Sequence, residues 1–174
     1  VIFESSSDQV MAADSNGLND IFWLDRDTGE VRLASSASDG TSSNGTSSKR
    51  SISDDGRWVV FDSDASNLTP DPHPGPGEQV NVYLKDMTTG VLRLLSNSAG
   101  ASYTGDSRRP EISGDGRGVA FESVTSLVAA DTNQLTDIYL YDRINDTLRL
   151  ASVTAGGSAG NGHSNNPVIS ADGS

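Results

Sequence analysis

The sequence predicts an all-β fold, a β-propeller of three four-stranded antiparallel blades, and three observations predict it. An Asp-Gly turn recurs at nearly constant spacing: 60 residues separate Gly56 from Gly116, and 57 separate Gly116 from Gly173. Each interval contains four short segments rich in β-branched and aromatic residues, which favour strands. No segment keeps the period near 3.6 that is typical of an amphipathic helix. Four short strands repeated at such a spacing are typical of propeller blades.

The first strand of each unit follows the Asp-Gly turn. Asp-Gly between two apolar runs is a strong hairpin signal, because both central residues of the tightest hairpin turns adopt a positive φ. The apolar run after the turn ends in Phe61 and in Phe121, and Phe3 ends a run of the same character near Val1. The expected first strands are residues 1–4, 58–61 and 118–121.

The second, third and fourth strands complete each unit. The second strand is followed by an aspartate, the third contains an arginine, and the fourth ends in Ile-Ser before the next Asp-Gly turn. We interpret the repeated arginines as outward or inter-strand pairs. The expected strands are residues 20–24, 81–85 and 137–141 (second), 31–33, 92–94 and 148–150 (third), and 51–53, 111–113 and 168–170 (fourth), and the arginines are Arg32, Arg93 and Arg149.

The chain is predicted to be a single β-propeller domain, residues 1–174, made of three repeats at about 1–57, 58–117 and 118–174. The pattern Ser-x-Asp-Gly-Arg-x-Val-x-Phe, then Asp-Ile-Tyr-x-x-Asp, then Leu-Arg-Leu resembles the WD-repeat-like blades of bacterial TolB-type β-propellers. Residues 65–68 and 131–133 are similar to a bacterial surface variant of these blades. The resemblance covers the whole chain. It implies the propeller fold and leaves the activity almost unspecified.

Closure of the ring is the open question that three blades raise. Propellers close with about 4 to 8 blades, and three blades leave unpaired edges that favour association. In TolB-type propellers the strand before the Asp-Gly turn is expected to lie innermost. One hypothesis is therefore a twofold homodimer in which each chain lends residues 168–170 to the first blade of the other, giving a six-bladed ring of 3 + 3 blades. The alternative is a fragment of a longer chain with further blades.

The composition excludes several classes of function. The chain carries 12 basic and 24 acidic residues, a net charge of −12. Broad binding to nucleic acid or to an anionic membrane needs a basic face, so no nucleic-acid partner is expected. No apolar run approaches the ~18 residues that cross a bilayer, so no membrane insertion is expected. The chain contains no cysteine, which excludes disulfides and Cys-ligated metal sites.

Two loops carry side-chain oxygens at positions i, i+2 and i+6, a pattern that suits a hard cation such as calcium. No glutamate stands at the twelfth position, so the loops differ from an EF-hand. The alternative interpretation is that these residues form Asx turns before a strand. No cofactor is expected to be required, and calcium is the candidate ligand. The candidate metal residues are Asp14, Asn16, Asp20, Asp131, Asn133 and Asp137.

Residues that differ between the repeats are candidate ligand contacts. Two basic pairs stand at matching places just before the innermost strand, and they predict a rim that binds an acidic sugar or a carboxylate-rich segment. The alternative is local charge balance against nearby aspartates. A Pro-rich loop in the middle unit adds one histidine, and its alternative is a tolerated insertion. The candidate ligand-binding residues are Lys49, Arg50, Arg108, Arg109 and His73.

Two function classes follow. The first is a non-catalytic binding or scaffolding propeller that recognises a protein or a glycan through one face of the ring. The second is an accessory or axial-pocket propeller of a secreted hydrolase or lyase. The sequence has no Gly-x-Ser-x-Gly elbow and no His-Glu-x-x-His motif, so no catalytic residue is assigned. The resemblance implies a secreted, periplasmic or cell-surface location, although the chain contains no segment typical of a signal peptide.

Overall fold

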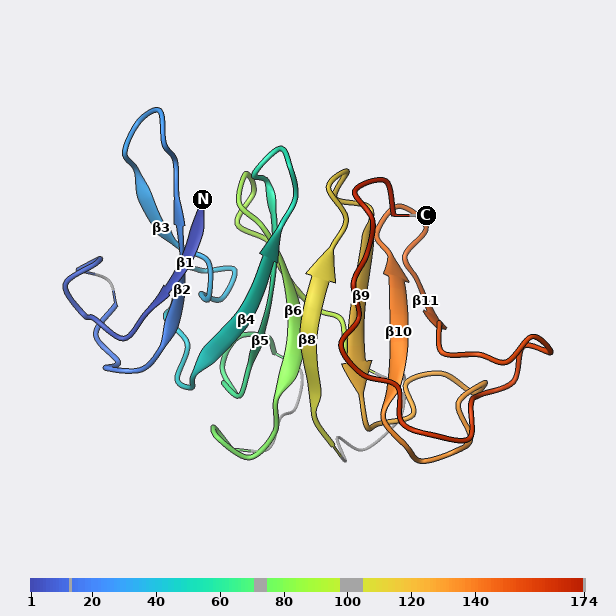
Figure 1. The fold of residues 1–174 in the computed structure, drawn as a ribbon. Coiled ribbons are helices and arrows are strands. Elements are labelled where there is room, and N and C mark those ends of the chain that lie inside the picture. The colour runs from blue at the N-terminus through green and yellow to red at the C-terminus, as the bar shows by residue number, and fades with distance from the viewer. Residues whose placement is uncertain (13, 71–74, 98–104, 174) are drawn as a thin grey trace.

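A computed structural model describes residues 1–12, 14–70, 75–97 and 105–173. Within these ranges the secondary structure consists of eleven β-strands and no helix, and therefore no helix long and apolar enough to cross a membrane. The strands form three antiparallel sheets that follow one another in chain order across Figure 1. The predicted all-β propeller architecture is confirmed.

The first sheet has three strands and the other two have four. The first sheet has the order β1-β2-β3, the second β4-β5-β6-β7 and the third β8-β9-β10-β11. The strands are β1 (Ile2–Ser5), β2 (Asp20–Leu24), β3 (Val31–Leu33), β4 (Ser47–Ile52), β5 (Trp58–Ser63), β6 (Asn81–Asp86), β7 (Leu92–Leu94), β8 (Ser107–Ile112), β9 (Gly118–Ser123), β10 (Asp137–Asp142) and β11 (Thr147–Leu150).

The sheets are offset from the sequence repeats by one strand. The last strand of each of the first two repeats, β4 and β8, opens the following sheet and pairs with β5 and β9. The corresponding segment of the third repeat, residues 168–170, forms no strand ladder within the described residues. Among the described residues, the first sheet accordingly has no strand equivalent to β4 and β8.

The hydrophobic core lies between neighbouring sheets. One cluster joins the first and second sheets and contains Ile21 and Phe61, and another joins the second and third and contains Val60 and Phe121. A stacked aromatic pair links β1 with β2, β5 with β6 and β9 with β10 at nearly the same separation. The ring centroids are 5.4 Å apart for Phe3–Phe22, 5.6 Å for Phe61–Tyr83 and 5.9 Å for Phe121–Tyr139.

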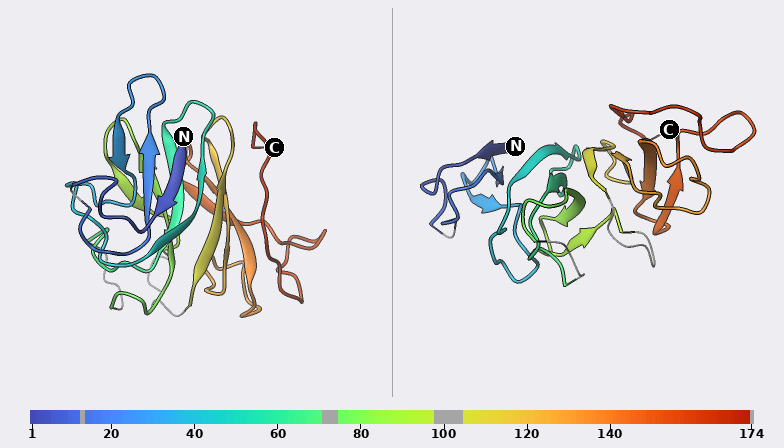
Figure 2. Two further views of the ribbon diagram at one scale, coloured as in Figure 1. Left: turned by 60° about the vertical axis from the view of Figure 1, so that its left-hand side comes forward. Right: turned by 90° about the horizontal axis from the view of Figure 1, so that it is seen from below.

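β1, β4, β8 and the C-terminal segment lie along the same side of the molecule, as the right-hand view of Figure 2 shows. Each of β4 and β8 therefore forms the inner edge of its sheet. Consecutive inner elements are joined through their turns: the Asp54 N–H donates to Gly114 O, and the Asp115 N–H donates to Ala171 O, both at 2.9 Å. The inner side is thus the continuous surface on which a channel would form in a closed ring.

Candidate functional site

The inner strands contain a bulge that sets the direction of their basic side chains. The pairing of β4 with β5 shifts register between Ser48 and Arg50, and that of β8 with β9 shifts between Arg108 and Glu111. At this point Lys49 has a φ of 36° and Arg109 a φ of 52°. A bulge places two residues opposite one and changes the aim of the side chains. The two residues with left-handed backbone conformation, Lys49 and Arg109, therefore belong to the basic rim that the sequence predicts.

A groove of about 400 Å³ follows these bulges. Three of the predicted ligand-binding residues line it together, Lys49 and Arg50 from β4 and Arg109 from β8. Arg108 is not among the residues that line it. The remaining lining residues are Pro110, Glu111, Asn166, Pro167 and Val168. The groove therefore combines side chains of two sheets with the C-terminal segment.

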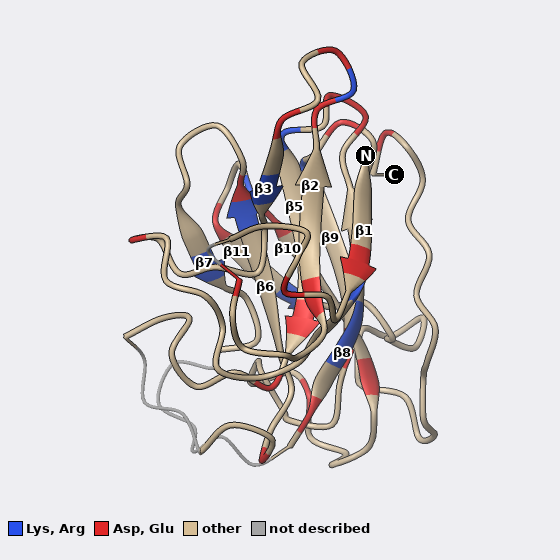
Figure 3. Ribbon diagram, turned by 90° about the vertical axis from the view of Figure 1, so that its left-hand side faces the viewer, with Lys and Arg blue, Asp and Glu red and all other residues tan. Residues whose placement is uncertain are grey.

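Three of the four basic residues predicted for the rim form an ion pair with a carboxylate of this chain. Arg50 pairs with Glu4 at 3.0 Å, Arg108 pairs with Asp106 at 2.7 Å, and Arg109 pairs with Glu122. The Lys49 side chain is exposed and makes no ion pair or hydrogen bond within the part of the chain that the structure describes, although its charge acts on the Asp62 carboxyl. Ion pairs within the chain thus neutralise three of the four basic side chains of the rim. Lys49 is the basic side chain of the rim that remains available to a ligand. In Figure 3 acidic residues are spread over strand ends and turns, and basic residues are fewer.

An acidic residue lies beneath each inner strand, and these acids are not among the site residues predicted from the sequence. Asp62 on β5 is buried and accepts hydrogen bonds from Ser48 Oγ at 2.8 Å and from the Arg109 N–H at 3.1 Å. Burial raises the pKa of the Asp62 carboxyl, and these hydrogen bonds oppose the rise. Glu122 on β9 similarly accepts the Asn166 N–H at 3.1 Å. The repeated acid after Phe3, Phe61 and Phe121 was the available signal.

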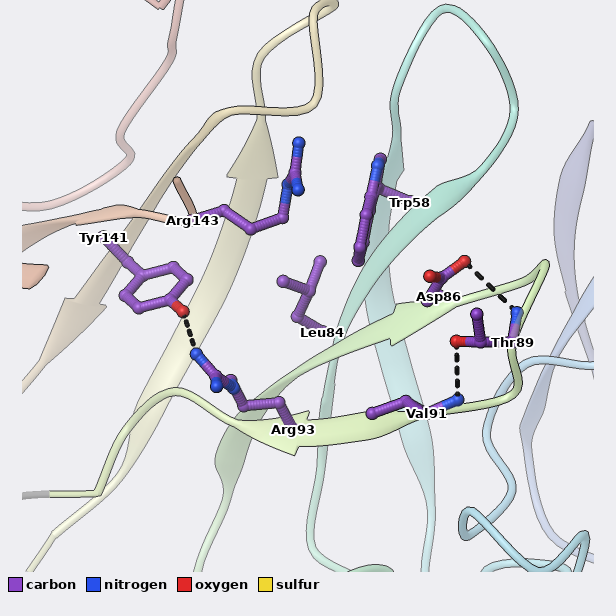
Figure 4. A pocket seen from close by; sticks show the side chains of 8 residues that line it. All are labelled: Trp58, Leu84, Asp86, Thr89, Val91, Arg93, Tyr141 and Arg143. Carbon is purple, nitrogen blue, oxygen red and sulfur yellow. Dashed lines mark hydrogen bonds between the residues drawn. The ribbon is translucent and has the colours of Figure 1, made fainter. Parts of the chain in front are cut away.

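A second cavity, of about 300 Å³, lies between the second and third sheets. Figure 4 shows Arg93 pointing to the Tyr141 hydroxyl, and Arg143 on the same side as Trp58. The Arg143 guanidinium lies 4.0 Å from the centre of the Trp58 ring, and its Nε donates to Gly116 O at 2.7 Å. A cation over a tryptophan face is attractive. The contacts join the two sheets, so these residues serve the interface between blades.

The predicted metal residues of the first loop hydrogen-bond to one another. Asn16 Nδ2 donates to Asp20 Oδ2 at 2.7 Å, and Asn16 Oδ1 accepts the Leu18 N–H at 2.7 Å. Asp20 Oδ1 accepts the hydroxyls of Ser35 and Ser43. Asn16 therefore turns a donor, not an oxygen ligand, toward Asp20. This is the Asx-turn geometry of the alternative interpretation.

The equivalent loop of the third sheet repeats the arrangement. Asn133 Nδ2 donates to Asp137 Oδ2 at 2.7 Å, and Asn133 Oδ1 accepts the Leu135 N–H at 2.7 Å. The Tyr139 hydroxyl donates to Asp131 Oδ2. Calcium needs six to eight oxygen ligands, and the described residues contain no group of three or more acidic or histidine side chains placed to hold a metal. The residues present fit a hydrogen-bonded loop better than a calcium site.

Asp14 is the exception in this network. Its side chain is 2% exposed, and neither carboxylate oxygen has a hydrogen-bond partner among the described residues. Burial raises the pKa of the Asp14 carboxyl, the charges of Asp20 and Asp8 add to the rise, and the nearby backbone N–H of Asn16 opposes it. Asp131 occupies the equivalent position beside the third sheet, where its carboxylate accepts a hydrogen bond from the Tyr139 hydroxyl. A single unpartnered carboxylate remains far short of a calcium ligand set.

Calcium is expected to leave the thermal midpoint of the protein unchanged. A ligand that binds the folded state raises stability in proportion to RT ln(1 + [L]/Kd), so calcium at ~1 mM would raise the midpoint clearly if its Kd were ~10 µM. The measurement is differential scanning calorimetry with calcium, with magnesium and with a chelator. A midpoint raised by calcium alone, and not in Asp137→Asn, would contradict the Asx-turn interpretation.

The two histidines lie in different situations. His73 belongs to residues 71–74, outside the described residues, so its place in a site stays a prediction. His163 accepts the Thr136 N–H at its Nδ1, at 3.0 Å, on an exposed loop. This hydrogen bond joins the loop that contains His163 to the residue directly before β10.

Comparison with known proteins supports the fold. No protein-family model matches the chain, and no curated protein matches it. The solved structure of TolB from Acinetobacter baumannii is similar over 90% of this chain and 30% of its own, with 20% identity and a TM-score of 0.52. The structure of a putative TolB from Agrobacterium tumefaciens is similar over 78% of this chain and 42% of its own, with 19% identity and a TM-score of 0.47. That of dipeptidyl peptidase 4 from Porphyromonas gingivalis is similar over 75% of this chain and 22% of its own, with 12% identity and a TM-score of 0.48. The chain thus spans less than half of each structure, and the first supports a TolB-like propeller fold.

Proposed function

We propose that the chain is a non-catalytic binding propeller whose inner groove recognises a carboxylate-bearing ligand, either an acidic peptide segment or an acidic glycan. The observation that carries the proposal is the convergence of Lys49, Arg50 and Arg109 on one groove of about 400 Å³. An exposed ammonium beside two guanidinium groups favours a carboxylate, because charge-assisted hydrogen bonds are about twice as strong as neutral ones.

The charges of the groove support a ligand with few carboxylates over a densely charged polymer. Arg50 and Arg109 remain paired with Glu4 and Glu122, so a ligand carboxylate meets Lys49 directly and shares the two guanidinium groups. Glu111, which lines the groove from β8, disfavours a ligand that is acidic along its whole length. Asn166 supplies both a donor and an acceptor for the uncharged part of the ligand.

Binding is tested by titration calorimetry with two chemically defined acidic probes, a glutamate hexapeptide and a galacturonic acid trimer, and with a glutamine hexapeptide as the neutral probe. We expect one acidic probe to bind in about 50 mM salt and to weaken at about 300 mM, because exposed charges are screened. Lys49→Gln is expected to weaken binding by about tenfold, equivalent to ~1.4 kcal/mol.

Arg108→Gln is the matched control, because Arg108 is a neighbouring cation with an ion pair but lies outside the groove lining. It should leave the affinity within about twofold of the wild type. Equal losses in Lys49→Gln and Arg108→Gln would point to diffuse charge and contradict the groove. Failure of both acidic probes to bind would overturn the proposal.

A location in the periplasm, at the cell surface or outside the cell is part of this proposal. It is supported by the resemblance of the repeats to TolB-type bacterial blades and by the polar loops that surround the strands.

A further inference from the structure

The cavity of about 300 Å³ between the second and third sheets contains residues that differ between the repeats. Arg143 follows β10 at the position that Met87 holds after β6, and Trp58 begins β5 at the position that Gly118 holds in β9. Residues that every blade needs recur with the repeat, and these two do not. The pairing of Arg143 with Trp58 therefore belongs to this boundary between sheets and not to the general architecture of a blade.

Val91 leaves an apolar side chain exposed on the lining of the same cavity. It is 57% exposed, although the equivalent residues of the other repeats are Glu30 and Thr147. The buried Leu84 on β6 also lines the cavity, and Figure 4 shows its side chain pointing into the space beside Trp58. Apolar side chains that line a concave surface together with a few polar groups are typical of a small-molecule site.

The Arg143 guanidinium is held in place by only part of its donor set. Its Nε donates to Gly116 O at 2.7 Å, and its central carbon lies 4.0 Å from the centre of the Trp58 ring. Its Nη1 and Nη2 make no hydrogen bond or ion pair among the described residues, although the charge acts on the Asp55 carboxyl. A guanidinium already fixed in this way offers its remaining N–H donors to a ligand at little cost in entropy.

Arg93 on β7 brings a second guanidinium to the cavity. Its Nη1 donates to the Tyr141 hydroxyl and to the exposed Asp146 carboxylate, and Figure 4 shows the arginine directed toward Tyr141. An exposed ion pair contributes little to stability, because water screens it. Sharing Arg93 with the carboxylate of a ligand therefore costs the fold little.

Asp86, the acidic residue of the lining, is already neutralised by a neighbour. Its carboxylate accepts hydrogen bonds from Arg57 Nε at 3.0 Å and Nη2 at 2.8 Å, and from the Thr88 N–H at 2.9 Å. The bond from Arg57 lowers the pKa of Asp86 to about 2. The lining therefore presents positive charge beside apolar side chains, in a chain whose net charge is −12.

We propose that this cavity binds an aromatic carboxylate. The carboxylate lies on the guanidinium groups of Arg143 and Arg93, because such pairs combine strong hydrogen bonds with a fixed geometry. The ring packs against Leu84, Val91 and Trp58, since a rigid aromatic body buries apolar area and has few rotamers to lose. The cavity shares no lining residue with the inner groove, so the proposal is independent of what that groove binds.

The charges around the cavity favour a carboxylate over a phosphate monoester. A phosphate monoester carries close to two negative charges near neutral pH. Asp86 and Asp146 lie beside the two guanidinium groups, Asp86 on the lining and Asp146 paired with Arg93. They repel a second negative charge more than they repel the first.

The test is a titration of the isotope-labelled chain with 2-naphthoate, followed by proton–nitrogen NMR. The chain has two tryptophans, so one indole N–H signal reports on the cavity and the other is a reference. We expect the Trp58 signal to shift with a Kd of about 1 mM or below, as is usual for a ligand of this size. The Trp23 signal should stay in place, because its Nε1 donates to Gly56 O at 2.8 Å and the residue lies outside the lining.

Three further probes separate the contributions of charge and ring. 2-Naphthamide has the ring without the charge, and acetate has the charge without the ring. Each is expected to bind about tenfold more weakly than 2-naphthoate. Equal affinity for 2-naphthamide would contradict the role of the arginines, equal affinity for acetate that of the apolar lining, and tighter binding of 2-naphthyl phosphate the choice of a carboxylate. No shift of the Trp58 signal with 2-naphthoate at about 10 mM would overturn the proposal.

Variants copied from the other repeats locate the site. Arg143→Met introduces the residue of the equivalent position, Met87, and should weaken 2-naphthoate about tenfold. Val91→Thr introduces the residue of the third repeat, keeps every charge and should weaken binding about threefold. Arg149→Gln is the matched control, because Arg149 is the exposed equivalent of Arg93 on β11 and lies outside this cavity. A loss in the control as large as that in Arg143→Met, or an unchanged affinity in both Arg143→Met and Val91→Thr, would place the binding elsewhere and overturn the proposal.

Discussion

Replacing Tyr139 with phenylalanine is expected to lower the free energy of unfolding by about 2–3 kcal/mol, although only one oxygen is removed. The Tyr139 hydroxyl donates to the buried Asp131 carboxylate and accepts the Leu127 N–H at 3.2 Å. Without it Asp131 Oδ2 and the Leu127 N–H lose a buried partner, and an unsatisfied buried group costs more than the bond itself contributes. Urea unfolding of the wild type and variant measures the difference.

Asp131→Asn and the double variant complete a cycle that isolates the interaction. A coupling energy below about 0.5 kcal/mol would contradict the role given to the hydroxyl. The first sheet offers the reverse experiment, because Phe22 occupies the place of Tyr139 and Asp14 that of Asp131. Phe22→Tyr is expected to raise stability by about 1 kcal/mol and to lower the pKa of Asp14, since a hydrogen bond to the charged carboxylate favours that form.

Between about pH 8 and pH 10.5 the free energy of unfolding is expected to rise by roughly 3 kcal/mol because of Lys85 alone. Lys85 is 4% exposed, and its ammonium donates to Ser36 O at 2.8 Å and to Ala37 O at 3.1 Å in the first sheet's loop. Burial lowers its pKa from 10.5 to about 8, against the smaller opposing effect of Asp39.

The sign follows from proton binding. The folded-state pKa lies below the unfolded value, so in this window the unfolded chain binds more protons, and stability increases as the pH rises. The cost of burying the charge is fully present below about pH 8. Lys85→Met is expected to lose this slope in denaturant unfolding measured from pH 7 to 10.5, and Lys49→Met, at an exposed lysine, should keep it. Parallel pH profiles in wild type and Lys85→Met would contradict the assignment.

The repeat carries most of what can be predicted about the fold. Periodicity and turn chemistry are local, so the Asp-Gly turns and the apolar runs beside them place the strands, and the matching aromatic pairs follow from the period alone. Pairing across sheets is not local. Arg32 and Arg93 were interpreted as outward or inter-strand pairs, but Arg32 bonds Met87 O at 2.9 Å and Arg93 bonds Tyr141, each on the following sheet.

The candidate site was partly predictable because some of its residues recur with the repeat, whereas their partners are distant in the sequence. The prediction of matching places just before the inner strand was wrong by one residue, because Lys49 and Arg109 share the bulge position and both pairs lie within β4 and β8. The structure nevertheless brings Lys49, Arg50 and Arg109 to one groove. Their carboxylate partners come from strands that are distant in sequence, so spacing could not show that Arg50 meets Glu4. The burial of Lys85 was not predicted, although a lysine at a repeat position held by Leu24 and Tyr141 was the available signal.

The backbone bonds that join one sheet to the next have a consequence for how such a chain arises. Ser47 and Ser107 make the same contact at the two boundaries between sheets, a hydrogen bond from the backbone N–H to the residue directly before β2 or β6. Ser164 repeats it between the third sheet and the C-terminal segment, so the same contact recurs with each repeat. In a repeat array stability is close to a sum of unit and neighbour terms. Duplication of a whole unit of about 60 residues then adds a boundary that is already compatible, and the ring size can change without inventing a new interface.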